Sequence, residues 1–134
     1  MQPNKHRTWA EIDLGAIEHN YRVICEAAKA PVLCVVKADC YGHGAVPVAN
    51  RLQSMGAPYF AVATVPEAVE LRENGIEKPI IILGYIDAAD MDTVAEYGIT
   101  APVYDEETAE LLSAAAVRTG RDITVHYKLD TGMT

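Results

Sequence analysis

The amine of Lys37 is the group in this sequence with the clearest capacity for covalent chemistry. Lys37 follows an apolar run over residues 32–36 and precedes a polar, glycine-bearing stretch that contains Asp39, Tyr41 and His43. A continuous apolar run of this length predicts a strand of a parallel sheet that is covered on both faces. Lys37 should therefore lie at the carboxyl end of that sheet, where α/β folds keep their chemistry.

Partial burial at a strand end disfavours the ammonium form of a lysine. The neutral amine can then accept a proton, or react with a carbonyl group such as the aldehyde of pyridoxal phosphate. The alternative is a lysine whose side chain simply reaches solvent from the strand end. The residue types alone leave both possibilities open.

The rest of the chain predicts a regular alternation of strands and helices that would position this lysine. We expect a short strand at residues 8–14, followed by strands near 32–36, 59–63, 79–83, 99–103 and 123–129. We expect helices over 15–29, 45–55, 66–73, 87–96 and 105–119, with Asp13 capping the first and a Thr64/Glu67 capping box opening the third. Strand onsets after the first helix recur about every 20 to 27 residues, which predicts βα units and a parallel sheet.

Two closures of such a sheet are possible, an open doubly wound sheet or a (β/α)₈ barrel. A dinucleotide-binding sheet favours the pattern GxGxxG after its first strand. Gly42 and Gly44 do not have that spacing, so the open sheet has less support.

Three ordered blocks of this sequence resemble one family, the alanine racemases. The stretch 37–44, KADCYGHG, resembles the family's pyridoxal-phosphate attachment motif. The stretches 8–14 and 16–21 are similar to its opening strand and first helix, and 126–133 is similar to its strand that carries a second functional lysine. The resemblance covers essentially the whole chain.

The resemblance implies an α/β fold that is the N-terminal portion of a (β/α)₈ TIM-type barrel. On this reading residues 15–134 form a partial, cofactor-binding barrel that is truncated after about five of the eight strands. Residues 1–14 supply a strand that pairs with a mostly β, C-terminal domain outside this sequence.

The resemblance also implies roles for five residues. Lys37 would be the Schiff-base lysine and one of two catalytic bases, and Tyr41 would contact the phosphate. Val35 and Leu83 would line the cofactor, although Val35 is equally well explained as ordinary core. Lys128 would be carbamylated and would orient an arginine seven residues later. An unmodified, solvated Lys128 is the alternative.

The implied activity is interconversion of L-alanine and D-alanine for cell-wall peptidoglycan, by a homodimer whose second base is a tyrosine of the partner's C-terminal domain. We expect residues 1–134 alone to be inactive and prone to associate through an open sheet edge. The alternatives are a serine or broad-specificity racemase, a non-catalytic pyridoxal-phosphate homeostasis protein, and a structural α/β domain with an incidental lysine.

Composition limits the partners and the compartment. The formal net charge is −8 and the isoelectric point is about 4.8, which argues against nucleic-acid and anionic-membrane partners. The three cysteines have neither a CxxC motif nor metal-type spacing, and we expect reduced thiols in the cytoplasm. No His, Asp or Glu group has the spacing of a metal site, and no apolar run has the length of a membrane span.

Overall fold

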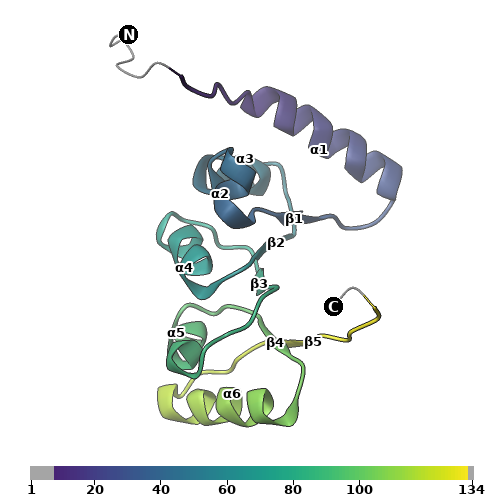
Figure 1. Ribbon diagram of the computed structural model, residues 1–134. Helices are drawn as coiled ribbons and strands as arrows, with labels where there is room; N and C mark the ends of the chain where they lie inside the picture. The colour runs from purple at the N-terminus through teal and green to yellow at the C-terminus, as the bar shows by residue number, and fades with distance from the viewer. Residues whose placement is uncertain (1–7, 133–134) are drawn as a thin grey trace.

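The computed structural model describes residues 8–132, in which each strand is followed by one or two helical segments up to the last strand, β5 (Figure 1). The elements are α1 (Leu14–Ala28), β1 (Leu33–Val35), α2 (Lys37–Gly42), α3 (Ala45–Ser54), β2 (Tyr59–Val62), α4 (Val65–Glu73), β3 (Ile80–Ile82), η1 (Ala88–Asp90), α5 (Met91–Glu96), β4 (Ala101–Val103), α6 (Glu106–Thr119) and β5 (Val125–Tyr127). Helices α3 to α6 descend one side of the molecule in chain order, with the strands beside them.

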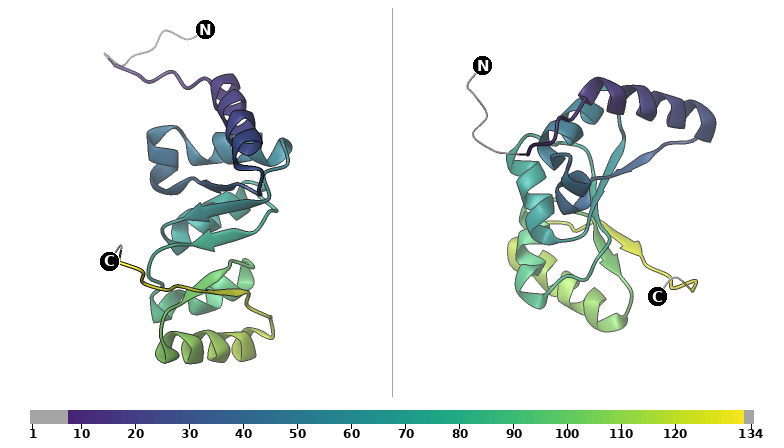
Figure 2. Two further views of the ribbon diagram at one scale, coloured as in Figure 1. Left: turned by 90° about the vertical axis from the view of Figure 1, so that its right-hand side faces the viewer. Right: turned by 45° about the horizontal axis from the view of Figure 1, so that its top comes forward.

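Every strand pair in the described chain is parallel, as predicted. Strands β1, β2 and β3 form one sheet in chain order, and β4 pairs with β5. The two views in Figure 2 show the helices gathered on one side of the strands. This arrangement is that of consecutive βα units, whose crossovers are right-handed in nearly all proteins.

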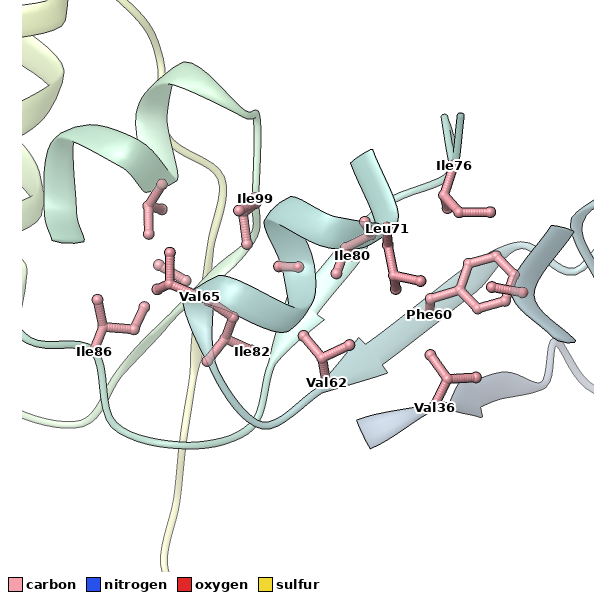
Figure 3. Packing of buried hydrophobic residues seen from close by; sticks show 14 of the residues in the cluster. Val36, Phe60, Val62, Val65, Leu71, Ile76, Ile80, Ile82, Ile86 and Ile99 are labelled. Carbon is pink, nitrogen blue, oxygen red and sulfur yellow. The ribbon is translucent and has the colours of Figure 1, made fainter. Parts of the chain in front are cut away.

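The core lies between the strands and these helices (Figure 3). Alternate strand residues point toward the helices and are buried, namely Val36, Phe60, Val62, Ile80 and Ile82. They pack against apolar residues of the helices and connecting loops, among them Val65, Leu71, Ile76, Ile86 and Ile99. Each such buried aliphatic side chain contributes about 1.5 to 3 kcal/mol relative to an exposed one.

The residues between these core positions face the opposite side of the sheet, because successive side chains of a strand alternate. We call this side the open face. It carries Val35, Ala61, Ile81 and, just beyond β3, Leu83, which is 36% exposed. In a barrel this side is the interior.

Strands β3 and β4 are joined by a single bridge, Ile81 to Thr100. The Ile82 N–H donates to the Thr100 carbonyl at 3.1 Å, and the next bond of a parallel ladder would run from the N–H of residue 102 to the Ile82 carbonyl. Residue 102 is proline, which has no N–H. The His126 Nε2 lies 3.1 Å from the Ile82 carbonyl oxygen. Because a carbonyl oxygen only accepts, Nε2 carries the hydrogen and donates.

The predicted helix starts are largely confirmed. Asp13 Oδ1 accepts from the N–H groups of Gly15 and Ala16 at 2.8 and 3.1 Å, which caps α1. Thr64 and Glu67 form the expected capping box at α4. The helix expected over 87–96 begins as the short 3₁₀ turn η1 before α5.

The N-terminal segment gives a different result. Residues 8–13 form no helix or strand within the described chain, and Leu14, expected at the end of a strand, begins α1. A strand needs a partner, and the expected partner belongs to another domain. The pairing of this segment therefore stays a prediction, and residues 1–7 lie outside the described part. In residues 8–132, no helix combines the length and the apolar character that crossing a bilayer demands.

Candidate active site

Lys37 lies two residues beyond β1, after Val36, and is half-buried at the carboxyl end of that strand. The last sheet bond before it runs from the Val36 N–H to the Ala61 carbonyl at 2.9 Å. The chain then leaves the sheet. The position matches the sequence prediction of a lysine at the mouth of parallel strands.

The backbone after Lys37 has an unusual conformation. Ala38, Asp39, Cys40 and Tyr41 all have positive φ, between 51° and 54°, so α2 is a left-handed turn and not an ordinary helix. Left-handed backbone costs an L-residue about 1 to 2 kcal/mol, and it rarely occurs in consecutive residues. Such strain persists only where surrounding contacts impose it, and it concentrates at functional sites.

Two sets of hydrogen bonds hold the turn. The Val36 carbonyl accepts from the Cys40 N–H, and the Asp39 carbonyl accepts from the Gly44 N–H, both at 2.9 Å. The Asp39 carboxylate accepts from the N–H of Ala45, the first residue of α3, at 2.6 Å. The sequence assigned no role to Asp39. The structure shows that it closes the turn onto the following helix.

Glu67 is a further contact that sequence reasoning missed at this site. Its Oε1 accepts from the Ala38 N–H at 2.8 Å, and its Oε2 accepts from the Ala63 N–H at 2.7 Å. The capping-box pattern identified Glu67 as a helix-start residue. Its contact with a residue 29 positions earlier had no sequence signal.

Leu83, just beyond β3, and Val35 of β1 share the open face. The resemblance implies that both line the cofactor, which stays a prediction. Between their strands, β2 and the residue after it contribute Tyr59, Ala61 and Ala63 to this face, with the two alanines toward the carboxyl end. Gly84 packs so closely beneath that an added Cβ would lie 2.3 Å from the Ala63 carbonyl oxygen. The three strand ends thus form a shallow, apolar floor.

Tyr41 and Lys128 each lie a few residues beyond a strand, Tyr41 after β1 and Lys128 after β5. Tyr41 ends the left-handed turn with its side chain 61% exposed. The Lys128 Nζ donates to the Leu83 carbonyl at 3.0 Å. This contact places the second strand-end lysine beside a predicted lining residue.

The thiols near Lys37 are poor competitors for its chemistry. Burial, with smaller contributions from Cys25 and Cys40, raises the pKa of the Cys34 thiol to about 11. Burial and then the Asp39 carboxylate raise the pKa of Cys40 above its ordinary value. Because the thiolate is the nucleophilic form, both thiols are less reactive near neutral pH than an ordinary cysteine.

Comparison with known proteins gives consistent matches. A family model described as alanine racemase, N-terminal domain, matches residues 12–134. The alanine racemase of Symbiobacterium thermophilum is 44% identical over 127 residues, which cover 94% of this chain and 34% of that protein. A solved alanine racemase from Clostridium difficile is 41% identical with a TM-score of 0.92, over 97% of this chain and 35% of that one. A histidine racemase from Leuconostoc mesenteroides is 31% identical with a TM-score of 0.84, over 92% of this chain and 33% of that one.

Two conclusions follow from these matches. The likeness in structure extends over nearly the whole chain and confirms the predicted fold, the N-terminal portion of a barrel of βα units. The chain spans about a third of the length of the relatives it matches.

Proposed function

The chain belongs to the alanine racemase family, whose N-terminal domain it matches over residues 12–134, and from this premise we propose that the protein interconverts L-alanine and D-alanine with pyridoxal phosphate attached to Lys37. The observation that carries the proposal is the setting of Lys37. The residue stands at a strand end, beside an apolar floor, and the chain after it is held in a strained left-handed turn. Such strain is maintained where geometry must be fixed.

The residues at this mouth fit the cofactor. Lys37 supplies the amine for attachment, and the exposed Tyr41 supplies a hydroxyl that can donate to a phosphate oxygen. Val35 and Leu83 lie on the apolar open face of the sheet, against which a flat ring can pack. We therefore assign Lys37, Tyr41, Val35 and Leu83 to cofactor binding.

When bound, pyridoxal phosphate provides an electron sink for the pair left behind when an amino acid loses its α-proton. The task of the protein is to present that proton to a base on each face of the substrate. We propose that the Lys37 Nζ accepts and returns the proton on one face. The left-handed turn fixes the backbone from which this amine extends.

Lys128 is proposed to be carbamylated. Its Nζ donates to the Leu83 carbonyl at 3.0 Å, and a carbamate nitrogen keeps one N–H that can make the same bond. Carbamylation would replace a cation with an anion that can accept two hydrogen bonds from a guanidinium group. An added carbon dioxide on Lys128 would be visible in an intact mass spectrum recorded at mild pH.

The second base is proposed to come from a partner subunit, in a cytoplasmic homodimer that supplies D-alanine for peptidoglycan. This proposal rests on the membership of the chain in the alanine racemase family. Residues 1–14 are proposed to pair with the β domain that completes such a polypeptide. We expect residues 1–134 alone to bind the cofactor without racemising alanine.

A second substrate deserves a direct test, because one structural relative is a histidine racemase. Racemisation of alanine and of histidine by the complete polypeptide can be compared by chiral chromatography. A higher kcat/KM for alanine supports the proposal. Preference for histidine, serine or many amino acids would assign the protein to another specificity within the same reaction class.

The role of Lys37 is tested by the absorbance of the chain with pyridoxal phosphate. We expect a visible band that disappears on borohydride reduction and is absent in Lys37→Ala. Peptide mapping after reduction should find the cofactor on Lys37.

The matched control is Lys78→Ala, which removes an exposed lysine away from the site. It should keep the band, since exposed lysines bind aldehydes only weakly and without selection. Equal labelling of Lys37 and Lys78 would contradict the assignment.

A further inference from the structure

We infer that Glu67 is a positioning residue. Its carboxylate accepts the hydrogen bonds of two N–H groups that would otherwise continue the β1–β2 ladder, and it thereby holds Lys37 and its left-handed turn in place. The inference rests on the proposed function for its consequence, but not for its geometry. It assigns Glu67 a role beyond starting helix α4. The evidence is the course of the hydrogen bonds where β1 leaves the sheet.

A parallel ladder follows a fixed sequence of bonds. The Val36 N–H donates to the Ala61 carbonyl at 2.9 Å, so the next two bonds would run from the Ala63 N–H to the Val36 carbonyl and from the Ala38 N–H to the Ala63 carbonyl. In the structure the Val36 carbonyl instead accepts from Cys40, at the start of the left-handed turn. The N–H groups of Ala63 and Ala38 both donate to the Glu67 carboxylate instead.

One carboxylate therefore takes the place of two backbone acceptors. Glu67 Oε1 accepts from Ala38 at 2.8 Å and Oε2 from Ala63 at 2.7 Å. This leaves the Val36 carbonyl available to the turn. Ala38 is bonded to Lys37, so the Glu67 contact fixes the peptide from which the lysine side chain starts.

The capping box alone does not explain these contacts. The capping bond, from the Thr64 N–H to Glu67 Oε2, is the longest of the three at 3.3 Å. The two shorter bonds tie the segment after β1 and the segment after β2 to the same carboxylate. Neither bond is needed to begin α4. Their existence distinguishes a residue that ties β1 to β2 from one that only caps a helix.

The site requires a carboxylate. Both oxygens accept from N–H groups, and a carboxylate has acceptors on both sides whereas the glutamine amide has an NH₂ group on one. In Glu67→Gln, therefore, one backbone N–H must face another donor. Bonds to a charged acceptor are also the stronger ones.

The first test measures amide hydrogen exchange in the chain without cofactor. In Glu67→Gln we expect the Ala38 and Ala63 amides to exchange about tenfold faster or more, since about 1.4 kcal/mol of a charge-assisted bond corresponds to tenfold. The Ile82 amide, which bonds to Thr100 in the sheet, should keep its rate. Unchanged exchange at Ala38 in Glu67→Gln would overturn the inference.

Two matched variants separate positioning from helix capping and from charge. Thr64→Ala weakens the capping box but leaves the Glu67 bonds to Ala38 and Ala63, so both amides should remain protected. Glu70→Gln removes the same charge from an exposed position of the same helix and should change neither amide. Faster exchange at Ala38 in Thr64→Ala equal to that in Glu67→Gln would show that Glu67 acts only through the helix start.

The second test measures the dissociation constant of pyridoxal phosphate and the yield of borohydride-trapped Lys37. Glu67→Gln should weaken binding about tenfold, while Thr64→Ala and Glu70→Gln bind as the wild type does. Failure of the wild type itself to trap cofactor on Lys37 would count against the proposed function, and the exchange data would still decide the role of Glu67. Normal trapping in Glu67→Gln would overturn the positioning role.

Glu67→Asp covers the case in which Glu67→Gln does not fold. Aspartate is also accepted in the first turn of a helix, but its carboxylate is one methylene shorter. We expect the Ala38 amide to lose protection in this variant while α4 remains folded. Full protection of Ala38 would contradict the inference.

Discussion

At the scale of single residues, Ala38 adopts a backbone conformation that its own side chain does nothing to stabilise. It has a φ of 51° without the side-chain hydrogen bonds that help asparagine and aspartate to adopt such angles. Its N–H donates a hydrogen bond to the Glu67 carboxylate, and the carboxylate of its neighbour Asp39 accepts a hydrogen bond from the Ala45 N–H. The strain of the turn is thus offset by contacts from α3 and α4.

Replacement of Ala38 by glycine should stabilise the protein, against the usual effect of this substitution. Glycine relieves about 1 to 2 kcal/mol of left-handed strain, and the greater freedom of the unfolded chain removes about 0.4 to 1 kcal/mol of that gain. We expect a rise of about 0.5 to 1 kcal/mol in the free energy of unfolding, measured by urea denaturation.

Ala114→Gly is the control for this prediction. Ala114 is exposed in α6, where glycine should lower stability by about 0.5 to 1 kcal/mol. Opposite signs for the two substitutions would verify the left-handed backbone at Ala38. A loss of stability in both would contradict it.

At the scale of elements, β4 is the strand that departs most from a regular ladder. Pro102 removes the N–H that would join it to β3, and His126 of β5 donates to the Ile82 carbonyl in its place. The His126 side chain thus donates the hydrogen bond that a backbone N–H of β4 would otherwise donate. The single bridge between β3 and β4 follows from one proline.

The two residues should be energetically coupled. His126→Ala leaves the Ile82 carbonyl without its donor and should cost about 1 to 3 kcal/mol. In a Pro102→Ala background the backbone N–H of residue 102 can serve the carbonyl, so the same His126→Ala substitution should cost less. A double-mutant cycle measures the difference. Additive losses would show that the His126 contact does not replace the missing ladder bond.

Local patterns predicted most elements of this fold. The apolar runs gave the positions of the strands, and Asp13 and Thr64 marked the starts of α1 and α4, because these signals lie within a few residues of the structure they determine. The left-handed turn could not be predicted, since none of its four residues is glycine and its supports include Glu67, 29 positions away. The candidate site residues were identified by resemblance, and their geometry came only from the structure.

At the scale of the whole molecule, Arg72 joins neighbouring βα units. Its guanidinium group donates to the carbonyls of Ile76 and Lys78 at 2.6 and 2.7 Å, and to those of Tyr97 and Gly98 at 3.0 and 3.1 Å. The first pair lies before β3 and the second before β4. Burial lowers the pKa of Arg72 below its ordinary value.

Arg72→Lys should therefore be destabilising although it conserves charge. A lysine ammonium presents its donors at one point and cannot reach carbonyls of two loops together. We expect a loss of about 1 to 2 kcal/mol in the free energy of unfolding, since part-buried carbonyls such as those of Ile76 and Tyr97 lose their donor.

Arg22→Lys serves as the comparison, because Arg22 is 63% exposed and pairs with Glu18 at the surface. It should change stability by less than about 0.5 kcal/mol. Similar effects at the two positions would argue that the Arg72 network does not hold the units together.

The order of the strands along the sheet is also their order along the chain. During synthesis on a ribosome, each strand from β2 onward therefore emerges when its partner has already been made. No pairing in the described chain has to wait for a later segment. The five described strands can thus join the sheet in the order in which they are translated, one βα unit at a time.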